Sequence, residues 1–182
     1  MEYSYKGYKI KIEQDPDPES PRTWDNLGYI MESNTKYDLG DVKETPEIIK
    51  KTMKRKDIIW LPYYLMDHGS ISVSTVDFGC QGDSAQIGII CVTREKVKKD
   101  FGIKRITQEW VDKIKDQLKS EVETMNQHLQ GDVHGYSIED TQGNDIDSCW
   151  GFYCEDYCKM EAEDVVDSYI PKSIKFVKKI SE

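Results

Sequence analysis

Residues 58–92 read IIWLPYYLMDHGSISVSTVDFGCQGDSAQIGIICV, and this stretch decides the fold. It contains three runs rich in β-branched and aromatic residues, which favour β-strands; they are Ile58–Met66, Ile71–Val76 and Ala85–Val92. The third run is long and apolar enough to be a central strand. Loops rich in Asp, Gly and Ser separate the runs, and these residues are typical of turns. The stretch therefore predicts the central strands of a sheet.

Two further strands are expected before this stretch. Residues 3–13, YSYKGYKIKIE, alternate polar and apolar side chains, which is the pattern of a half-buried strand. Residues 15–21, DPDPESP, cannot continue a helix or a central strand, because proline has no amide hydrogen to donate. We expect a short strand at Leu27–Glu32 to pair back on the first strand.

Three helices are expected around the central strands. The first begins at Thr45-Pro46-Glu47, with a capping hydroxyl, a proline at the first helical position and an acid in the first turn, and runs to about Lys56. Thr93 caps a short helix that ends near Phe101-Gly102. The longest helix runs from Thr107 to about Gln130 and is amphipathic. Its apolar positions recur every three or four residues, at Trp110, Ile114, Leu118, Val122, Met125 and Leu129.

The C-terminal part predicts a hairpin followed by helices. Val133–Glu139 and Ile146–Tyr153 form the two strands of the hairpin, and a Gln-Gly-Asn-Asp turn joins them. Cys154–Ser168 is expected to be an acidic helix. Pro171–Ile180 is expected to be a short basic helix.

Strands and helices occur in blocks rather than in strict alternation, which favours an α+β fold with a mostly antiparallel sheet. The long amphipathic helix and the acidic C-terminal helix complete this fold. A chain of 182 residues has the length of one domain and shows neither an internal repeat nor a linker. We therefore expect one α+β domain over residues 1–182.

Composition limits the classes of protein that remain. Eleven Tyr and four Trp argue against disorder, although only 37% of the residues are hydrophobic. No apolar run approaches the ~20 residues of a membrane helix, so no membrane partner is expected. The N-terminus lacks the apolar stretch of a signal peptide. Five cysteines at irregular spacing fit free thiols in a reducing compartment. These features predict a cytoplasmic protein.

The formal charge of −9 is unevenly distributed. Between Ser120 and Tyr169, thirteen Asp and Glu residues stand against a single Lys. A concentrated acidic surface repels nucleic acid and attracts basic grooves. Like charges at neighbouring helix positions also oppose local stability. The acids on this predicted helix therefore have two possible explanations, which are binding to a basic partner and plain solubility. The candidate partner-binding residues are Glu155, Asp156, Glu161, Glu163, Asp164 and Asp167.

Basic residues dominate the end of the first predicted helix. They are suited to contact the phosphate backbone of double-stranded DNA, although no recognised base-reading module accompanies them. A DNA-binding accessory protein is therefore an alternative function. The candidate backbone contacts are Lys50, Lys51, Lys54, Arg55 and Lys56.

The loops between the central strands offer a candidate enzyme site. His68 would act as a base, Ser70 or Cys80 as a nucleophile, and Asp67 or Asp83 would orient the base. With these residues, the chain would be a small hydrolase. Asp-His-Gly-Ser and Asp-Phe-Gly-Cys are also ordinary turn sequences. We favour the turn interpretation and expect no catalytic residue, with Asp67, His68, Asp83 and Ser84 kept as a possible site.

Three cysteines near the predicted acidic helix invite a metal interpretation. Cys149, Cys154 and Cys158 would supply thiolates, with His134 or Cys80 as a fourth ligand. The spacing is not that of paired Cys-x-x-Cys ligands, and free cysteine is commonly a small core residue. We therefore expect neither a metal nor a cofactor.

Two longer stretches resemble a known family. They are LPYYLMDHGSISVSTVDFGCQGDSAQIGIICVTREKV, residues 61–97, and EVETMNQHLQGDVHGYSIEDTQGNDIDSCWGFY, residues 121–153. The pieces that carry the resemblance are Leu-Pro and Asp-His before a strand, then Asp-Ser-x-Gln-x-Gly, Gln-x-Leu-x-Gly-Asp-Val and Asp-Ser-Cys-Trp-Gly-Phe-Tyr. The family consists of small proteins carried by phages, plasmids and integrated elements of gut Firmicutes and related bacteria. Its typical pattern has Trp before Asp-Ser, where this chain has Gly82.

The whole chain is similar to the members of this family that are anti-CRISPR proteins. The resemblance implies an inhibitor of the type II CRISPR effector nuclease, acting with or without guide RNA bound. It implies no catalytic residues. Type II effectors hold nucleic acid in positively charged channels, so an acidic hairpin and helix over residues 132–167 is expected to occupy such a groove.

Overall fold

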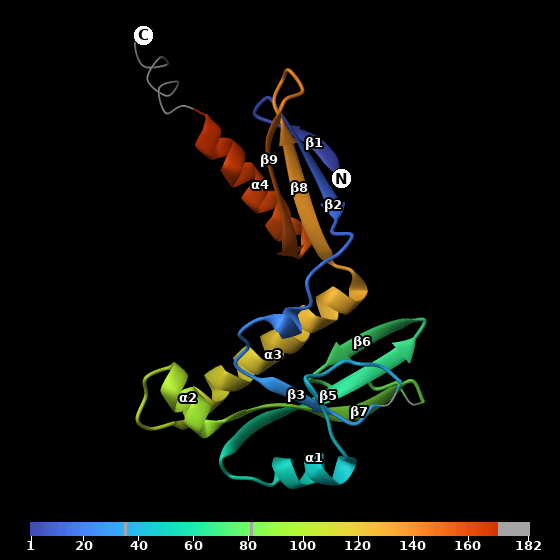
Figure 1. Cartoon of the computed structure of the whole chain (residues 1–182), viewed down its shortest axis with the longest axis vertical. Helices are drawn as coiled ribbons and strands as arrows, with labels where there is room; N and C mark the ends of the chain where they lie inside the picture. The colour runs from blue at the N-terminus through green and yellow to red at the C-terminus, as the bar shows by residue number, and fades with distance from the viewer. Residues whose placement is uncertain (35, 81, 171–182) are drawn as a thin grey trace. The chain divides into compact units, whose positions relative to one another are not determined.

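The computed structural model describes residues 1–34, 36–80 and 82–170 (Figure 1). It confirms an α+β fold with mostly antiparallel sheets, a long amphipathic helix and an acidic C-terminal helix. The basic helix expected at Pro171–Ile180 lies outside the described residues. In chain order the elements are β1 (Glu2–Tyr5), β2 (Tyr8–Gln14), η1 (Pro21–Thr23), β3 (Tyr29–Glu32), β4 (Val42–Lys43), α1 (Pro46–Met53), β5 (Ile58–His68), β6 (Ser70–Ser74), β7 (Ser84–Thr93), α2 (Arg94–Asp100), α3 (Gln108–Gln130), β8 (Val133–Glu139), β9 (Asp145–Tyr153) and α4 (Glu155–Tyr169).

The chain forms two compact units. The terminal unit consists of Met1–Glu19 and Gly131–Glu182, and the central unit is Ser20–Gln130. The central unit is thus an insertion between two segments that share one fold. The expectation of one domain over residues 1–182 does not separate these units, because the first boundary falls in a short proline-rich turn and the second falls at a helix end.

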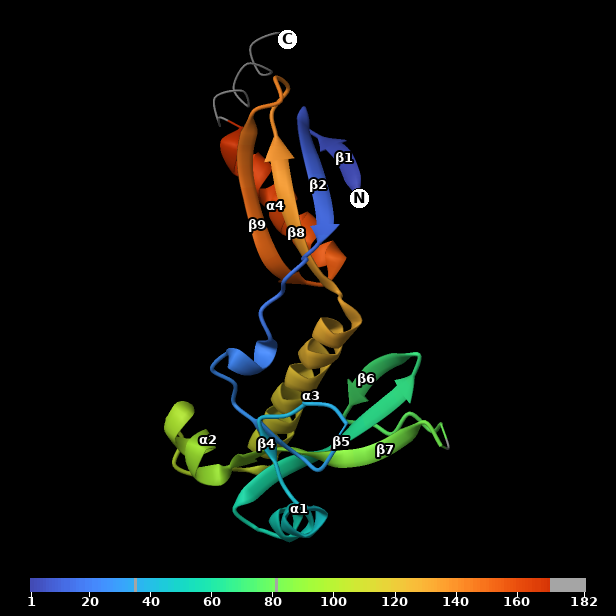
Figure 2. The same ribbon diagram turned by 45° about the vertical axis from the view of Figure 1, so that its right-hand side comes forward.

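The terminal unit is a four-stranded antiparallel sheet with α4 packed on one face (Figure 2). The strand order is β1-β2-β8-β9. The predicted strand at residues 3–13 is in fact the hairpin of β1 and β2, because Lys6 and Gly7 take positive φ angles of 49° and 90° and turn the chain. Its core joins the sheet to α4 through Ile10, Ile12, Tyr136, Ile138, Cys158, Ala162 and Val166.

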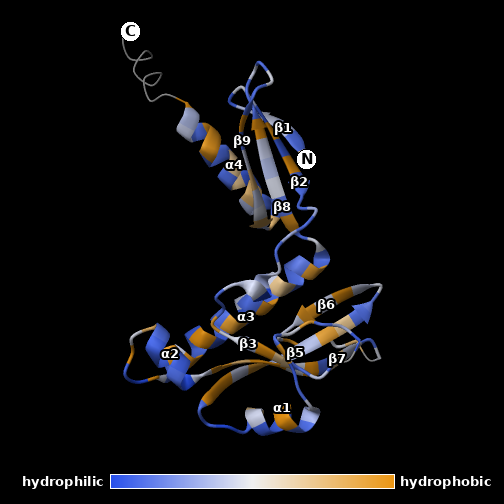
Figure 3. Ribbon diagram, in the orientation of Figure 1, coloured by the Kyte–Doolittle hydropathy of each residue, from blue (hydrophilic) through white to orange (hydrophobic). Residues whose placement is uncertain are grey.

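The central unit is a five-stranded sheet in the order β4-β3-β7-β5-β6. Alternate residues of the strands point to opposite faces. On one face they pack against the apolar stripe of α3, and on the other they pack against Ile49 of α1. Figure 3 shows apolar residues concentrated in β5, β7 and one stripe of α3. Ala85–Val92 is a central strand as predicted, since β7 lies between β3 and β5.

The predicted pairing of Leu27–Glu32 with the first strand is wrong. The strand exists as β3, but it pairs antiparallel with β7 and parallel with β4. The first strand pairs with β8 instead. Both partners of β3 come later in the sequence, so proximity along the chain gives the wrong pair.

Candidate functional site

The whole formal charge of the protein belongs to the terminal unit. The central unit contains 17 Lys and Arg against 17 Asp and Glu, whereas the terminal unit contains 8 Lys against 17 Asp and Glu. The central unit is therefore formally neutral, and the terminal unit carries the whole formal charge of −9. The acidic region identified from the sequence therefore corresponds to a structural unit, except for Glu121 and Glu123, which belong to α3.

Helix α4 presents a mixed surface to solvent. It buries Cys158, Ala162 and Val166 against the sheet. On the opposite side Tyr157 and Met160 remain 48% and 50% exposed. Asp156, Glu161 and Asp164 surround these two side chains at helical spacings. We call these five residues the acidic face.

The acids of α4 differ in what they contact. Glu163 accepts a hydrogen bond from the Tyr3 hydroxyl at 3.1 Å, and Asp167 forms an ion pair with Lys6. Lys159 lies over the Tyr3 ring, 5.1 Å from its centroid. Burial and the bond to Glu163 raise the pKa of Tyr3. These contacts tie α4 to the β1–β2 hairpin, so Glu163 and Asp167 already have a structural role.

Glu155 and Asp156 occupy the first turn of α4. Acids at this position stabilise a helix because they face its positive end. The expectation that the acids of this helix oppose its stability is therefore too simple for these two. The N-cap is Cys154, at φ +79°, and its side chain makes no capping bond, whereas the two first-turn acids favour this helix end electrostatically.

Glu161 and Asp164 have no ion pair among the residues that the structure describes. The Glu161 carboxylate accepts a hydrogen bond from the Tyr157 hydroxyl, and this contact raises the pKa of Tyr157. Burial, followed by Asp147 and other groups that include Glu161, raises the pKa of Tyr136 to about 12. Negative charge thus gathers where α4 runs beside β9. Of the described lysines in the β1–β2 hairpin, Lys6 pairs with Asp167 of α4, whereas Lys9 and Lys11 pair with acids outside α4.

The possible enzyme site is brought together only in part. His68 Nδ1 lies 3.0 Å from Asp83 Oδ2, but the imidazole is 77% exposed. The Asp67 carboxylate accepts bonds from Lys36 at 2.6 Å and from Tyr37 at 2.9 Å, and these contacts lower its pKa. Ser84 donates to Asp77 at 3.2 Å. The four side chains thus divide into three separate contacts. Ser70 lies opposite His68 in the β5–β6 ladder, but among the described residues no hydrogen bond joins a Ser or Cys side chain to the imidazole.

We predict that replacing both His68 and Asp83 by asparagine leaves the fold and any inhibitory activity within a few-fold of wild type. The pair is exposed, and exposed ion pairs contribute about 0–1 kcal/mol. Thermal unfolding and a nuclease-inhibition titration measure the two properties. A folded double variant with no activity would contradict this prediction and restore the enzyme hypothesis.

The candidate DNA-backbone contacts lie on α1 and the turn after it. Lys50, Lys51, Lys54, Arg55 and Lys56 are all exposed. Arg55 forms an ion pair with Asp57, so Arg55 is less available to bind a phosphate group. Arg94, distant in sequence, joins this group because its Nε donates to the Lys56 carbonyl at 3.0 Å.

The cysteines are separated by environment. Burial raises the pKa of both Cys91 and Cys158 to about 11, so these thiols stay protonated near neutral pH. Cys80 and Cys149 are exposed. Within residues 1–34, 36–80 and 82–170, no group of three or more His, Cys, Asp or Glu side chains could hold a metal ion.

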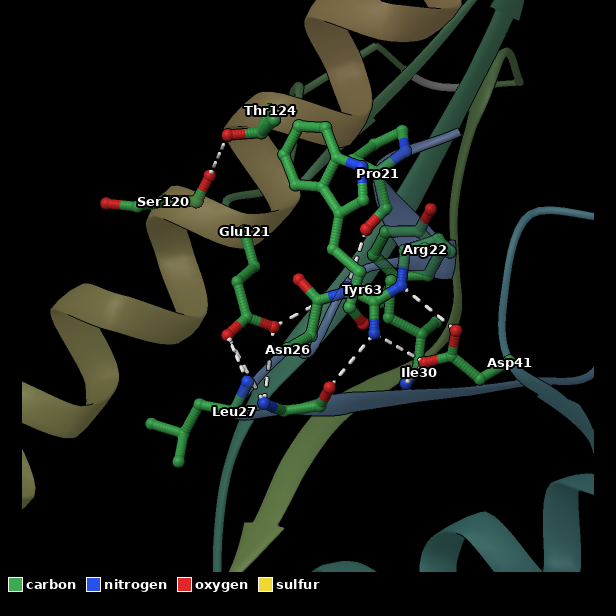
Figure 4. Close-up of polar contacts among 12 residues, drawn as sticks. Pro21, Arg22, Asn26, Leu27, Ile30, Asp41, Tyr63, Ser120, Glu121 and Thr124 are labelled. Carbon is green, nitrogen blue, oxygen red and sulfur yellow. Dashed lines mark hydrogen bonds and ion pairs between the residues drawn. The ribbon is translucent and has the colours of Figure 1, made fainter. Parts of the chain in front are cut away.

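A buried ionic network, which no local sequence pattern predicts, lies in the central unit (Figure 4). Arg22 pairs with Asp41 and lies 3.4 Å from Glu121, and their side chains are 10%, 25% and 6% exposed. Glu121 accepts from the backbone amides of Leu27, at 2.9 Å, and Gly28. Asp41 accepts from Ile30, at 2.7 Å. The network fixes the segment before β3 between α3 and the β3–β4 loop.

The network is structural. A pocket of about 250 Å³ lies beside it, between Trp24 and Thr124. The carboxylate of Glu121 on its wall already accepts from two backbone amides and from Arg22, so it serves contacts within the fold. The sequence signal was an acid at position 121, between Leu118 and Met125, on the apolar stripe of the long helix.

The chain matches no known protein family, no curated protein and no solved structure. Among the described residues, no helix combines the length and the apolar character needed to cross a membrane.

Proposed function

We propose that this protein is an inhibitor that binds the type II CRISPR effector nuclease and blocks its DNA targeting or cleavage. The mechanism is stoichiometric and non-enzymatic, and the protein acts in the cytoplasm of a bacterial host. The observation that carries the proposal is the confinement of all net charge to the terminal unit, together with the exposed acidic face. The nuclease is proposed as the partner because residues 61–97 and 121–153 resemble the family that includes anti-CRISPR proteins.

Charge complementarity supports this choice of partner. The effector holds nucleic acid in positively charged channels and reads a short flanking motif with arginines. A surface carrying Glu161 and Asp164 without ion pairs among the described residues attracts such a channel. In such a channel, this acidic surface would compete with nucleic acid for the same Lys and Arg side chains of the nuclease.

The apolar part of the acidic face supports protein binding rather than mere solubility. Tyr157 and Met160 lie half-exposed at the centre of the carboxylates. Protein interfaces are enriched in aromatic residues and Met at their centre and are polar at the rim. A purely solubilising helix face needs neither side chain.

Co-purification with the nuclease, with and without guide RNA, tests the proposal when followed by a cleavage titration. We expect a complex and complete inhibition at a defined molar ratio. Inhibition that continues to rise through turnover, with the nuclease covalently altered, would indicate an enzyme. Absence of both a complex and inhibition would overturn the proposal.

DNA-backbone binding is the second candidate, supported by the five exposed cations near α1 and by the addition of Arg94. It predicts retention on double-stranded DNA that falls steeply with salt, because bound phosphates release counterions. The same preparations distinguish it from the inhibitor, since it requires no nuclease.

A further inference from the structure

Half of strand β5 has a free edge. On one side β7 pairs with β5 from Ile58 to Met66. On the other side β6 pairs with it only from Tyr64 to His68 (Figure 2). Within the part of the chain that the structure describes, no strand therefore covers the second side of residues 58–63.

The register identifies the backbone groups on this edge. The Arg94 amide donates to the Asp57 carbonyl, and Ile58 lies opposite Thr93. In an antiparallel ladder, residues alternate between hydrogen-bonded pairs and pairs whose polar groups point away. The amides of Ile58 and Trp60, and the carbonyls of Ile58, Trp60 and Pro62, therefore point to the free edge. Proline at such a position is typical of an edge strand.

A groove runs along this edge. Its volume is about 350 Å³, and it is lined by residues 58–62 of β5, by Val111 and Lys115 of α3, and by Arg94. Leu61 and Val111 are partly buried against the core, so the groove has apolar walls. The indole of Trp60 is fixed because its Nε1 donates to the Met53 carbonyl at 3.0 Å.

The charge of the groove is positive. Arg94 and Lys115 come from different elements and line the same space, and none of the described lining residues is acidic. Arg94 is held in place by its bond to the Lys56 carbonyl. The exposed cations Lys54 and Lys56 precede the strand and extend the positive region.

We propose that this groove binds an extended, acidic segment of a partner protein, which adds to the free edge of β5 as a further strand. A free edge beside a helix supplies main-chain hydrogen bonds, and its side pockets select alternate side chains. The apolar walls accept the residues of one face of the segment. Arg94 and Lys115 pair with its carboxylates. This site lies in the central unit and does not depend on the inhibitor function proposed for the terminal unit.

The test uses the full-length chain and the acetylated, amidated peptide TVEVEIET. We expect the peptide to slow hydrogen exchange at the amides of Ile58 and Trp60 by at least tenfold, measured by NMR. The Ile59 amide is an internal control, because it already points toward Val92 of β7. The matched peptide TVKVKIKT, which replaces each acid by lysine, is expected to leave all three amides unchanged.

A pair of variants tests the electrostatic part. Lys115→Glu is expected to weaken binding of the acidic peptide at least tenfold. Lys119→Glu makes the same charge change one turn further along α3, outside the lining residues, and is expected to stay within twofold of wild type. Both lysines are exposed, so the fold should survive either change.

Three results would overturn the proposal. In the first, the acidic peptide does not bind, or binds without protecting Ile58 and Trp60. In the second, Lys115→Glu and Lys119→Glu weaken binding equally, which would show attraction without a defined groove. In the third, the two amides become protected with rising protein concentration alone, which would assign the groove to a second copy of this chain.

Discussion

Reversing Glu161 and Asp164 together to lysine is expected to raise the Kd for the nuclease by at least thirtyfold and to abolish inhibition at concentrations where wild type is complete. The physical reason is the loss of desolvated charge pairs, each of which can cost about 2–5 kcal/mol when broken. These two carboxylates are chosen because they lack ion pairs among the described residues and, unlike Asp156, lie outside the first turn of α4. Binding measured by interferometry, at several salt concentrations, checks the result.

The matched control reverses Asp112 and Asp116 to lysine on the exposed side of α3. The charge change is the same, but both residues belong to the neutral central unit. We expect at most a few-fold loss there, mainly in the association rate, because charges outside the contact surface act through a screened field with a reach of about 8 Å. Equal losses in the two variants would show that net charge alone drives binding. An unaffected first variant would mean that α4 is only a solubilising helix.

Side-chain periodicity was the most informative feature for predicting the helices and strands from the sequence. The alternation in β2 and β8, the apolar run of β7 and the three- and four-residue spacing in α3 each identify an element from local residues alone. Which strands pair with one another depends on contacts between residues far apart in the sequence. The sequence at β3 contains nothing that distinguishes β7 from β2 as its partner. In the structure β3 pairs with β7, and Ile30 of β3 joins the core that includes the buried residues of α3.

The candidate site was predictable in its residues but not in their roles. The count of acids identified α4 as a charged helix. Only the structure separates Glu163 and Asp167, which contact Tyr3 and Lys6, from Glu161 and Asp164. Contacts between residues about 160 positions apart leave no local pattern in the sequence. For the same reason the pairing of Arg22 with Glu121 was not foreseen.

Replacing Glu121 by alanine is expected to destabilise the central unit by about 3–5 kcal/mol, a typical cost of removing one partner from a buried ion pair. The variant leaves Arg22 without one of its two carboxylates and leaves the amides of Leu27 and Gly28 without their acceptor. The segment cannot rearrange freely, because a Cβ at Gly28 would already lie 2.3 Å from Leu118. With total stabilities of about 5–15 kcal/mol, this loss corresponds to a fall in Tm of roughly 10–20 °C.

The matched control is Glu123→Ala, which removes the same side chain two positions along the same helix. Glu123 is exposed, and its one ion pair among the described residues is with Lys119, at 3.6 Å, so its loss should stay within about 0.5 kcal/mol. Glu121→Gln should fall between the two, because its amide oxygen still accepts from one backbone amide while the charge opposite Arg22 is lost. Calorimetry and circular dichroism measure the unfolding temperatures of the three variants and so give the order of their stability losses. If Glu121→Ala unfolds at the temperature of Glu123→Ala, Asp41 alone is sufficient for Arg22, and the segment before β3 is held by apolar packing rather than by the network.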